Sequence, residues 1–322
     1  MTLVTVLCGA LLGTACSASD ADVNAPSTPP SMSVPPAQAR IVSAEELDAR
    51  TVDLTIDSPA LGTLAKVRLL LPTPSSSPPV SGWPVLYLLH GCCDTYQSWT
   101  RYTDVAQFMA DAGVLVVMPD GGRVGFYSDW LDGPGWETFH VTELPQLLAK
   151  SYAAGDRRAI AGLSMGGFGA LSYAARNPDM FAAAASFSGI VHTRLSSQVS
   201  QNYLGLLRSE GADPEALWGD PAKDAKTWAD HNPYDLAANL RGTPVYLSVG
   251  DGQVGPLDPP GARPDSLEAR LNAENVAFRE RLAEFGVEAT VDFCGPGTHT
   301  WPYWERALHQ AWPMLSAALA GG

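Results

Sequence analysis

The residues best suited to covalent chemistry are a serine and its flanking glycines, in the run Gly162-Leu163-Ser164-Met165-Gly166. An apolar strand is predicted over residues 158–163, before the serine, and an alanine-rich helix over residues 166–176, after it. A strand, turn and helix in this order hold a serine in a tight turn and lift its hydroxyl above the sheet. The pattern predicts a nucleophile at Ser164. The alternative is a glycine-rich joint in which this serine only caps the helix.

A serine hydroxyl is inert at neutral pH until a neighbouring base removes its proton. The histidines that could do so are His90, His140, His192, His231, His299 and His309. In a hydrolase sheet the base lies in a loop after the last strand, and only His299 does, between a strand predicted at 289–293 and a final helix predicted at 301–320. The sequence therefore predicts His299 as the base.

A carboxylate that orients the base is expected after the penultimate strand, because the chain order in such sheets is nucleophile, acid, base. Asp251 follows the strand predicted at 245–249 directly, and Glu268 opens the helix predicted at 267–285. Composition does not decide between the two carboxylates, so both remain candidates at this point.

The elements that must position these groups follow an alternating pattern. Buried strands are predicted at 85–89, 114–118, 158–163, 181–187, 245–249 and 289–293, and helices at 105–112, 138–152, 166–176, 267–285 and 301–320. Strands that are apolar throughout are buried on both faces, so the alternation predicts an α/β fold: a mostly parallel, doubly wound sheet with helices on both faces. Two half-buried antiparallel strands, 51–56 and 65–71, should precede it. Residues 190–240 fit no strand pattern and are predicted to be an insertion.

Six segments together resemble the esterase family of the α/β-hydrolase fold that includes the mycobacterial antigen 85 mycolyltransferases and esterase D. They are Tyr87-Leu88-Leu89-His90-Gly91, Phe126-Tyr127-Ser128-Asp129-Trp130, Trp136-Glu137-Thr138-Phe139, Glu143-Leu144-Pro145-Gln146, Gly162-Leu163-Ser164-Met165-Gly166 and Gly297-Thr298-His299-Thr300-Trp301. In the mycolyltransferases the acid is a glutamate in a Leu-Glu pair, near the start of the helix after the penultimate strand. Leu267-Glu268 holds that place, so the resemblance favours Glu268 over Asp251.

The resemblance also implies an oxyanion hole made of two backbone N–H groups. One follows the nucleophile and belongs to Met165; the other follows the glycine of the loop after the third strand and belongs to Cys92. Both would face the negative charge that develops when the carbonyl becomes tetrahedral, where each donor is worth about 3–4 kcal/mol.

This sequence departs from the mycolyltransferases in two loops. Where those enzymes carry an acidic residue and an arginine that contact trehalose, this chain has His90 and Cys93, and residues 131–135 replace a short cysteine-bridged loop. We therefore expect the catalytic groups to be shared but the trehalose specificity not to be. The pair His90-Gly91 is typical of hydrolytic members. We expect His90 and Trp301, which is beside the base, to bind substrate.

The N-terminal residues predict export. Residues 3–12 are apolar, small residues follow, and Cys16 comes next, which resembles a bacterial lipoprotein signal whose cysteine becomes lipidated. The expected organisation is a signal peptide over 1–16, a Pro/Ser-rich linker over 17–39 and a catalytic domain over 40–322. This predicts a secreted or cell-envelope protein, with Cys16 as the point of any membrane attachment.

Processing would leave Cys92, Cys93 and Cys294 in the folded domain. Their spacing matches no zinc pattern, so no metal is expected, and the proposed chemistry needs no cofactor. Export makes one disulfide plausible. A bridge from Cys294 to Cys92 or Cys93 would join the loop of the base to the oxyanion loop.

Composition narrows the classes of function. The chain has 322 residues, 46% of them hydrophobic, and 34 acidic against 20 basic residues give a net charge of −14. Such a protein repels nucleic acid, and no apolar run reaches the length of a membrane span.

We expect a serine esterase that acts on small-molecule or lipid acyl esters through an acyl-serine. The alternatives are an acyltransferase acting on a sugar or glycerol acceptor, and a cell-surface binding protein without catalysis.

Overall fold

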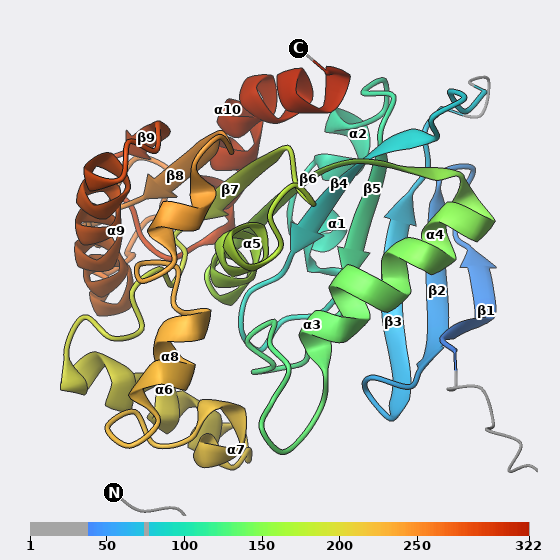
Figure 1. Cartoon of the computed structure of the whole chain (residues 1–322). Coiled ribbons are helices and arrows are strands. Elements are labelled where there is room, and N and C mark those ends of the chain that lie inside the picture. The colour runs from blue at the N-terminus through green and yellow to red at the C-terminus, as the bar shows by residue number, and fades with distance from the viewer. Residues whose placement is uncertain (1–37, 74–76, 322) are drawn as a thin grey trace, which may run out of the picture. The chain divides into compact units, whose positions relative to one another are not determined.

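A mixed sheet of nine strands forms the centre of the computed structural model, which describes residues 38–73 and 77–321 (Figure 1). The strands are β1 (Arg40–Glu46), β2 (Thr51–Ser58), β3 (Thr63–Leu70), β4 (Trp83–Leu89), β5 (Leu115–Pro119), β6 (Ala154–Leu163), β7 (Ala183–Phe187), β8 (Val245–Val249) and β9 (Ala289–Phe293). Their order across the sheet is β1-β2-β3-β5-β4-β6-β7-β8-β9. The pairings β1–β2, β2–β3 and β3–β5 are antiparallel, and those from β5 to β9 are parallel.

Helices cover both faces of this sheet. One face packs against α4 (Leu144–Tyr152), α5 (Met165–Arg176) and α9 (Ser266–Glu284), and the other against α1 (Ser98–Tyr102), α2 (Val105–Phe108) and α10 (Trp301–Ala320). Strands β5 and β7 are buried at every position, as expected for strands between two helical layers. The predicted α/β architecture, a mostly parallel doubly wound sheet, is confirmed.

Two of the predicted helices differ from the structure. The predicted helix over 105–112 forms only its first turn, α2. The predicted helix over 138–152 begins as α3 (Trp136–Thr138), widens into a π-helical turn at Phe139–Glu143 and continues as α4. The irregular turn comes just before Pro145, which has no N–H for the helix and clashes with the preceding turn.

The segment between β7 and β8 carries α6 (Ser197–Ser209), α7 (Pro214–Trp218), α8 (Ala225–His231) and a 3₁₀ turn at Ala237–Leu240. Figure 1 shows α6, α7 and α8 gathered beyond the end at which the parallel strands finish. Trp218 of α7 packs edge-on against Phe126, in the loop after β5, with ring centroids 5.6 Å apart. These helices therefore border the end of the sheet where the loops after the strands gather.

Candidate active site

Ser164 lies in the turn between β6 and α5, and its backbone is strained. Its φ of +52° is positive, and residues other than glycine rarely adopt such a backbone conformation. The neighbouring glycines make the turn possible. A Cβ on Gly162 would lie 2.2 Å from the carbonyl oxygen of Gly166, and one on Gly166 would lie 2.4 Å from that of Leu89. The flanking glycines thus leave room for the tight turn that the sequence predicts around Ser164, between β6 and α5.

Glu268 and His299 form a close pair. Glu268 is in the first turn of α9 and has no exposed surface, and its Oε2 is 2.6 Å from Nδ1 of His299. Its Oε1 accepts hydrogen bonds from the Ser188 hydroxyl and the Gly250 N–H, both at 2.7 Å. A carboxylate beside Nδ1 keeps a proton there and leaves Nε2 as the acceptor.

The competing carboxylate is directed elsewhere. Oδ1 of Asp251 accepts the N–H of Gln253 at 2.8 Å, within its own loop, and its backbone N–H donates to Gly295. Among the residues that the structure describes, its side chain makes no hydrogen bond to His299. The structure therefore brings Glu268, and not Asp251, to the imidazole.

Two further residues, Ser188 and Trp304, lie beside this pair. Ser188, just after β7, has a positive φ of 46°, and its hydroxyl accepts a hydrogen bond from Nε1 of Trp304 at 3.0 Å while donating to Glu268. The Trp304 ring also meets His299 edge-on, with centroids 4.9 Å apart. Ser188 and Trp304 therefore hold the acid and the base together. No local motif marks Ser188, because three separate segments meet there.

The nucleophile is linked to this pair through the segment that contains Ser188. The N–H of Ser164 donates to Phe187 O at 2.9 Å, and the N–H of Ile190 donates to Ser164 O at 3.2 Å. Within residues 38–73 and 77–321, the Ser164 hydroxyl itself makes no hydrogen bond, and neither does Nε2 of His299. In unliganded sites such contacts often close only when substrate binds.

The two expected oxyanion donors are both unengaged. Neither the Cys92 N–H nor the Met165 N–H donates to any acceptor in the described part of the chain. The loop of Cys92 lies beside the nucleophile, since a Cβ on Gly91 would be 3.3 Å from the Cβ of Ser164. Two free N–H groups next to the serine can receive a developing negative charge.

The structure places the side chain of His90 inside the protein, so the expected contact between His90 and substrate stays a prediction. Its side chain is 1% exposed, and both ring nitrogens are engaged: Nε2 accepts the Gly121 N–H at 2.9 Å, and Nδ1 lies 2.8 Å from Gly91 O. That carbonyl and the Cys92 N–H belong to one planar peptide, in which they point in opposite directions. By donating to the carbonyl, Nδ1 of His90 fixes the direction of the Cys92 N–H, which is the expected oxyanion donor.

Trp301 is half-buried at the start of α10. Its ring packs against Trp99 and Tyr102, with centroids 5.4 and 5.1 Å away, and against Trp304. Tyr102 is exposed. A contact between Trp301 and substrate stays a prediction.

The hypothesis of a disulfide from Cys294 to Cys92 or Cys93 is wrong, because all three are free thiols. Cys294 follows β9, and its Sγ approaches Val249 O at 3.6 Å, whereas Cys92 and Cys93 follow β4. Three strands separate β4 from β9, so four inter-strand steps place them about 19 Å apart. A disulfide needs Cα atoms within about 7 Å. Cys8 and Cys16 lie outside the described residues.

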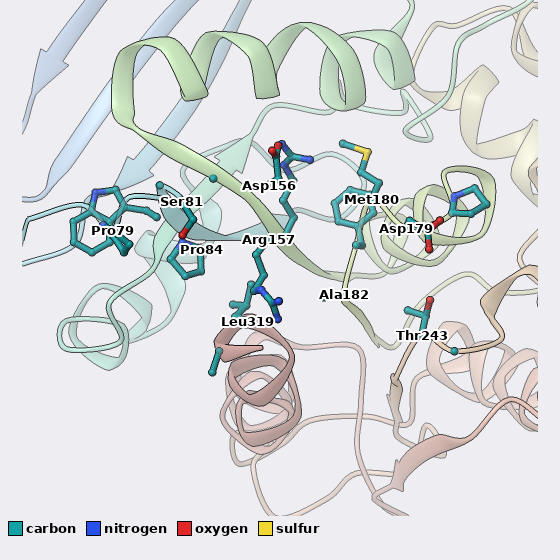
Figure 2. A pocket seen from close by; sticks show the side chains of 18 of the residues that line it. Pro79, Ser81, Pro84, Asp156, Arg157, Asp179, Met180, Ala182, Thr243 and Leu319 are labelled. Carbon is teal, nitrogen blue, oxygen red and sulfur yellow. The ribbon is translucent and has the colours of Figure 1, made fainter. Parts of the chain in front are cut away.

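A groove of about 1040 Å³ opens at the other end of the sheet (Figure 2). Its lining includes Trp83 at the start of β4, Gly155 in β6, and Ala182 and Thr243 just before β7 and β8. These positions are at the amino ends of the parallel strands, away from Ser164. In the described residues, no group of three or more metal-binding side chains could hold an ion.

Comparison with known proteins agrees with this geometry. The family described as "Putative esterase" matches residues 58–315. The diacylglycerol acyltransferase/mycolyltransferase Ag85B of Mycolicibacterium smegmatis is 31% identical over 282 residues, which cover 83% of this chain and 84% of that protein.

Solved structures agree as well. MPT51 of Mycobacterium tuberculosis superposes with a TM-score of 0.70 at 25% identity, over 84% of this chain and all of that one. An S-formylglutathione hydrolase from Agrobacterium tumefaciens gives 0.67 at 19% identity, over 87% of this chain and 99% of that one, which shows the fold alone. The chain is thus an enzyme of ester hydrolysis or acyl transfer, and it belongs to the esterase family of the α/β-hydrolase fold, together with the antigen 85 mycolyltransferases.

Proposed function

We propose that this protein is a serine esterase that cleaves acyl esters through an acyl-serine intermediate, with Ser164 as nucleophile, His299 as base and Glu268 as acid. One observation carries the proposal: a fully buried carboxylate 2.6 Å from Nδ1 of a histidine, joined through Ser188 to the segment that holds the serine turn. A buried charge of this kind needs partners, and here they are a histidine, a hydroxyl and a backbone N–H.

In the first half of the reaction, Oγ of Ser164 attacks the ester carbonyl carbon while Nε2 of His299 takes its proton. Glu268 stabilises the imidazolium that forms. The carbonyl oxygen becomes an oxyanion, which accepts hydrogen bonds from the Cys92 and Met165 N–H groups. When the tetrahedral intermediate collapses, His299 returns the proton to the leaving alcohol.

In the second half, a nucleophile clears the acyl-serine. His299 takes a proton from water, the resulting hydroxide attacks the acyl carbon, and Ser164 leaves with the proton restored. An acceptor hydroxyl of a sugar or glycerol could replace water, which would make the same residues an acyltransferase. The name of the 31% identical relative supports this second candidate. The His90-Gly91 pair supports hydrolysis.

The site is tested by hydrolysis of a p-nitrophenyl ester such as the butyrate. Ser164→Ala should lower kcat by at least about a thousandfold, because it removes the attacking oxygen. Ser151→Ala, on the exposed surface of α4, is the matched control and should keep the wild-type rate. Equal rates for wild type and Ser164→Ala would contradict the proposal.

A second experiment separates hydrolysis from transfer. With trehalose, glycerol or diacylglycerol added, an esterase releases free acid in proportion to the ester consumed, whereas an acyltransferase forms the acylated acceptor. Product analysis by mass spectrometry distinguishes the two. An acylated acceptor as the main product would favour the acyltransferase.

A further inference from the structure

Asp265 is the residue just before α9, and its carboxylate contacts the segments of both the acid and the base. It is half-buried and lies three positions before Glu268. The sequence offers Asp251 and Glu268 as candidate carboxylates for this site. The contacts of Asp265 were not visible in any motif.

One oxygen of Asp265 caps α9. Oδ1 accepts the N–H of Leu267 at 2.8 Å and the N–H of Glu268 at 3.2 Å. The backbone of Asp265 is extended, as is usual for a capping residue. Because the second of these N–H groups belongs to the acid itself, the cap fixes the Cα from which the Glu268 side chain departs.

The other oxygen reaches the base. Oδ2 accepts the backbone N–H of His299 at 3.1 Å. His299 lies in the loop between β9 and α10, where no strand or helix holds its backbone. The same carboxylate therefore fixes two Cα positions, and their side chains meet at 2.6 Å.

The rest of the Asp265 segment holds the base loop in the same way. Asp258 accepts hydrogen bonds from the hydroxyls of Thr298 and Tyr303, on either side of His299. The N–H groups of Asp251 and Gly252 donate to Gly295 and Gly297. Asp265 differs from these contacts because its one carboxylate bonds both the first turn of α9 and the backbone of His299.

We propose that Asp265 is a positioning residue that couples Glu268 to His299 through a single carboxylate. The inference rests on the proposed function and deepens it. Loss of the Oδ2 contact should let the base loop shift relative to α9 without unfolding either segment. Small displacements of catalytic groups lower the rate strongly, so kcat should fall while KM stays near its wild-type value.

The test is Asp265→Asn, assayed with the p-nitrophenyl ester. Asparagine caps a helix about as well as aspartate, so the amide oxygen keeps the cap while the NH₂ faces the His299 N–H and cannot accept it. We expect kcat to fall about tenfold with KM and the melting temperature little changed. Asp265→Ser, whose side chain can also cap α9 but is too short to reach the His299 N–H, should show the same loss of kcat as Asp265→Asn. Asp213→Asn, at the cap of α7, is the matched control.

A double variant distinguishes positioning from a general structural role. If Asp265 acts through the acid–base pair, adding Asp265→Asn to Glu268→Gln should cost much less than it costs in the wild type. Wild-type kcat in both Asp265 variants would overturn the inference, and so would a loss of kcat that follows an equal loss of thermal stability. The proposed function would survive either result as long as Ser164→Ala is inactive.

Discussion

Glu268 is the buried charge on which the site depends. Its carboxylate is fully enclosed, and removing a charge from water is costly unless hydrogen bonds replace the lost hydration. Three donors do so here, from Ser188, Gly250 and His299. The same donors point the carboxylate at Nδ1. This arrangement explains why a glutamate well beyond the penultimate strand can take the role that Asp251 could have filled.

The first prediction compares the two carboxylates. Glu268→Gln should lower kcat for ester hydrolysis by on the order of a thousandfold, because the neutral amide neither fixes the Nδ1–H tautomer nor stabilises the imidazolium. Asp251→Asn should stay within about twofold of wild type, since its side chain bonds only its own loop. Steady-state kinetics of both variants decide the point. A larger loss in Asp251→Asn would reverse the assignment.

The second prediction concerns His90. His90→Phe removes the hydrogen bond to Gly91 O and frees the peptide that carries the Cys92 N–H. We expect kcat to fall by about tenfold to a hundredfold with a small change in KM, because the donor acts on the transition state. His309→Phe, in α10 about two turns beyond its start, where the ring stacks on Phe108, is the matched control. A raised KM at unchanged kcat would favour the substrate-contact role.

At the scale of elements, one buried face of α9 both carries Glu268 and contacts the segment between β7 and β8 through Glu274. That face carries Glu268, Glu274 and Asn275 beside its apolar residues. Glu274 accepts the hydroxyl of Tyr203 in α6 at 2.6 Å and the N–H groups of Val191 and His192 after β7. Burial raises the pKa of Glu274 to about 7. The carboxyl therefore ties the helices between β7 and β8 to α9.

The third prediction follows from that raised pKa. Between the unfolded value of 4.5 and about 7, the unfolded chain loses its proton while the folded one keeps it, so folding stability falls as pH rises through this window. The loss is on the order of 3 kcal/mol. In Glu274→Gln this pH-dependent part of the folding stability should be absent. In Glu280→Gln, at an exposed position of α9, it should remain.

The measurement is the free energy of unfolding in urea at about pH 5 and about pH 8, compared between each variant and wild type. Burial also lowers the pKa of His140 and His192 to about 4, which opposes the effect of Glu274 in the same pH range. Those histidines are present in all three proteins, so the difference isolates Glu274. Parallel pH curves for wild type and Glu274→Gln would contradict the prediction.

The elements were largely predictable, because their signals are local. Apolar runs marked β4 to β8, and the glycines around Ser164 marked the turn. Strand β9 was predicted to be buried but has no buried position, because it lies at the edge of the sheet. Strand β1 was missed because almost all of its side chains are exposed and show no apolar alternation. The short α1 also escaped, since five residues are too few for a helical period.

The candidate site was predictable only in part. Ser164 followed from its motif and His299 from its place in the chain, but choosing Glu268 over Asp251 required a family resemblance. The supporting contacts of His90, Ser188 and Asp265 join loops that are distant in sequence, and no pattern within a segment encodes such meetings. The disulfide hypothesis was wrong for a related reason, because the spacing of cysteines along the chain carries no information about the order of strands in the sheet.

At the scale of the whole molecule, the candidate catalytic residues and the large groove lie at opposite ends of one sheet, and the described residues belong to one compact unit. No helix among the described residues is long and apolar enough to cross a membrane. The prediction of export and attachment rests on the first sixteen residues, which lie outside the described part. We propose a secreted or envelope-attached enzyme on the basis of that sequence.

The fourth prediction tests attachment. In a bacterial host that processes lipoproteins, the full chain should fractionate with membranes, and Cys16→Ser should release it because no lipid can be added. Cys8→Ser, within the segment expected to be removed, is the matched control. Immunoblots of membrane and soluble fractions give the answer. Equal membrane content for wild type and Cys16→Ser would contradict attachment through this residue.

The central claim is that Ser164 is activated by His299 and Glu268, and covalent labelling tests it most directly. A p-nitrophenyl phosphonate ester should transfer one phosphonyl group to the protein with release of p-nitrophenol, and peptide mass mapping should place the adduct on Ser164. The account predicts no adduct in Ser164→Ala and labelling at least about a hundredfold slower in His299→Ala. An adduct on another residue, or unchanged labelling of Ser164→Ala, would contradict it.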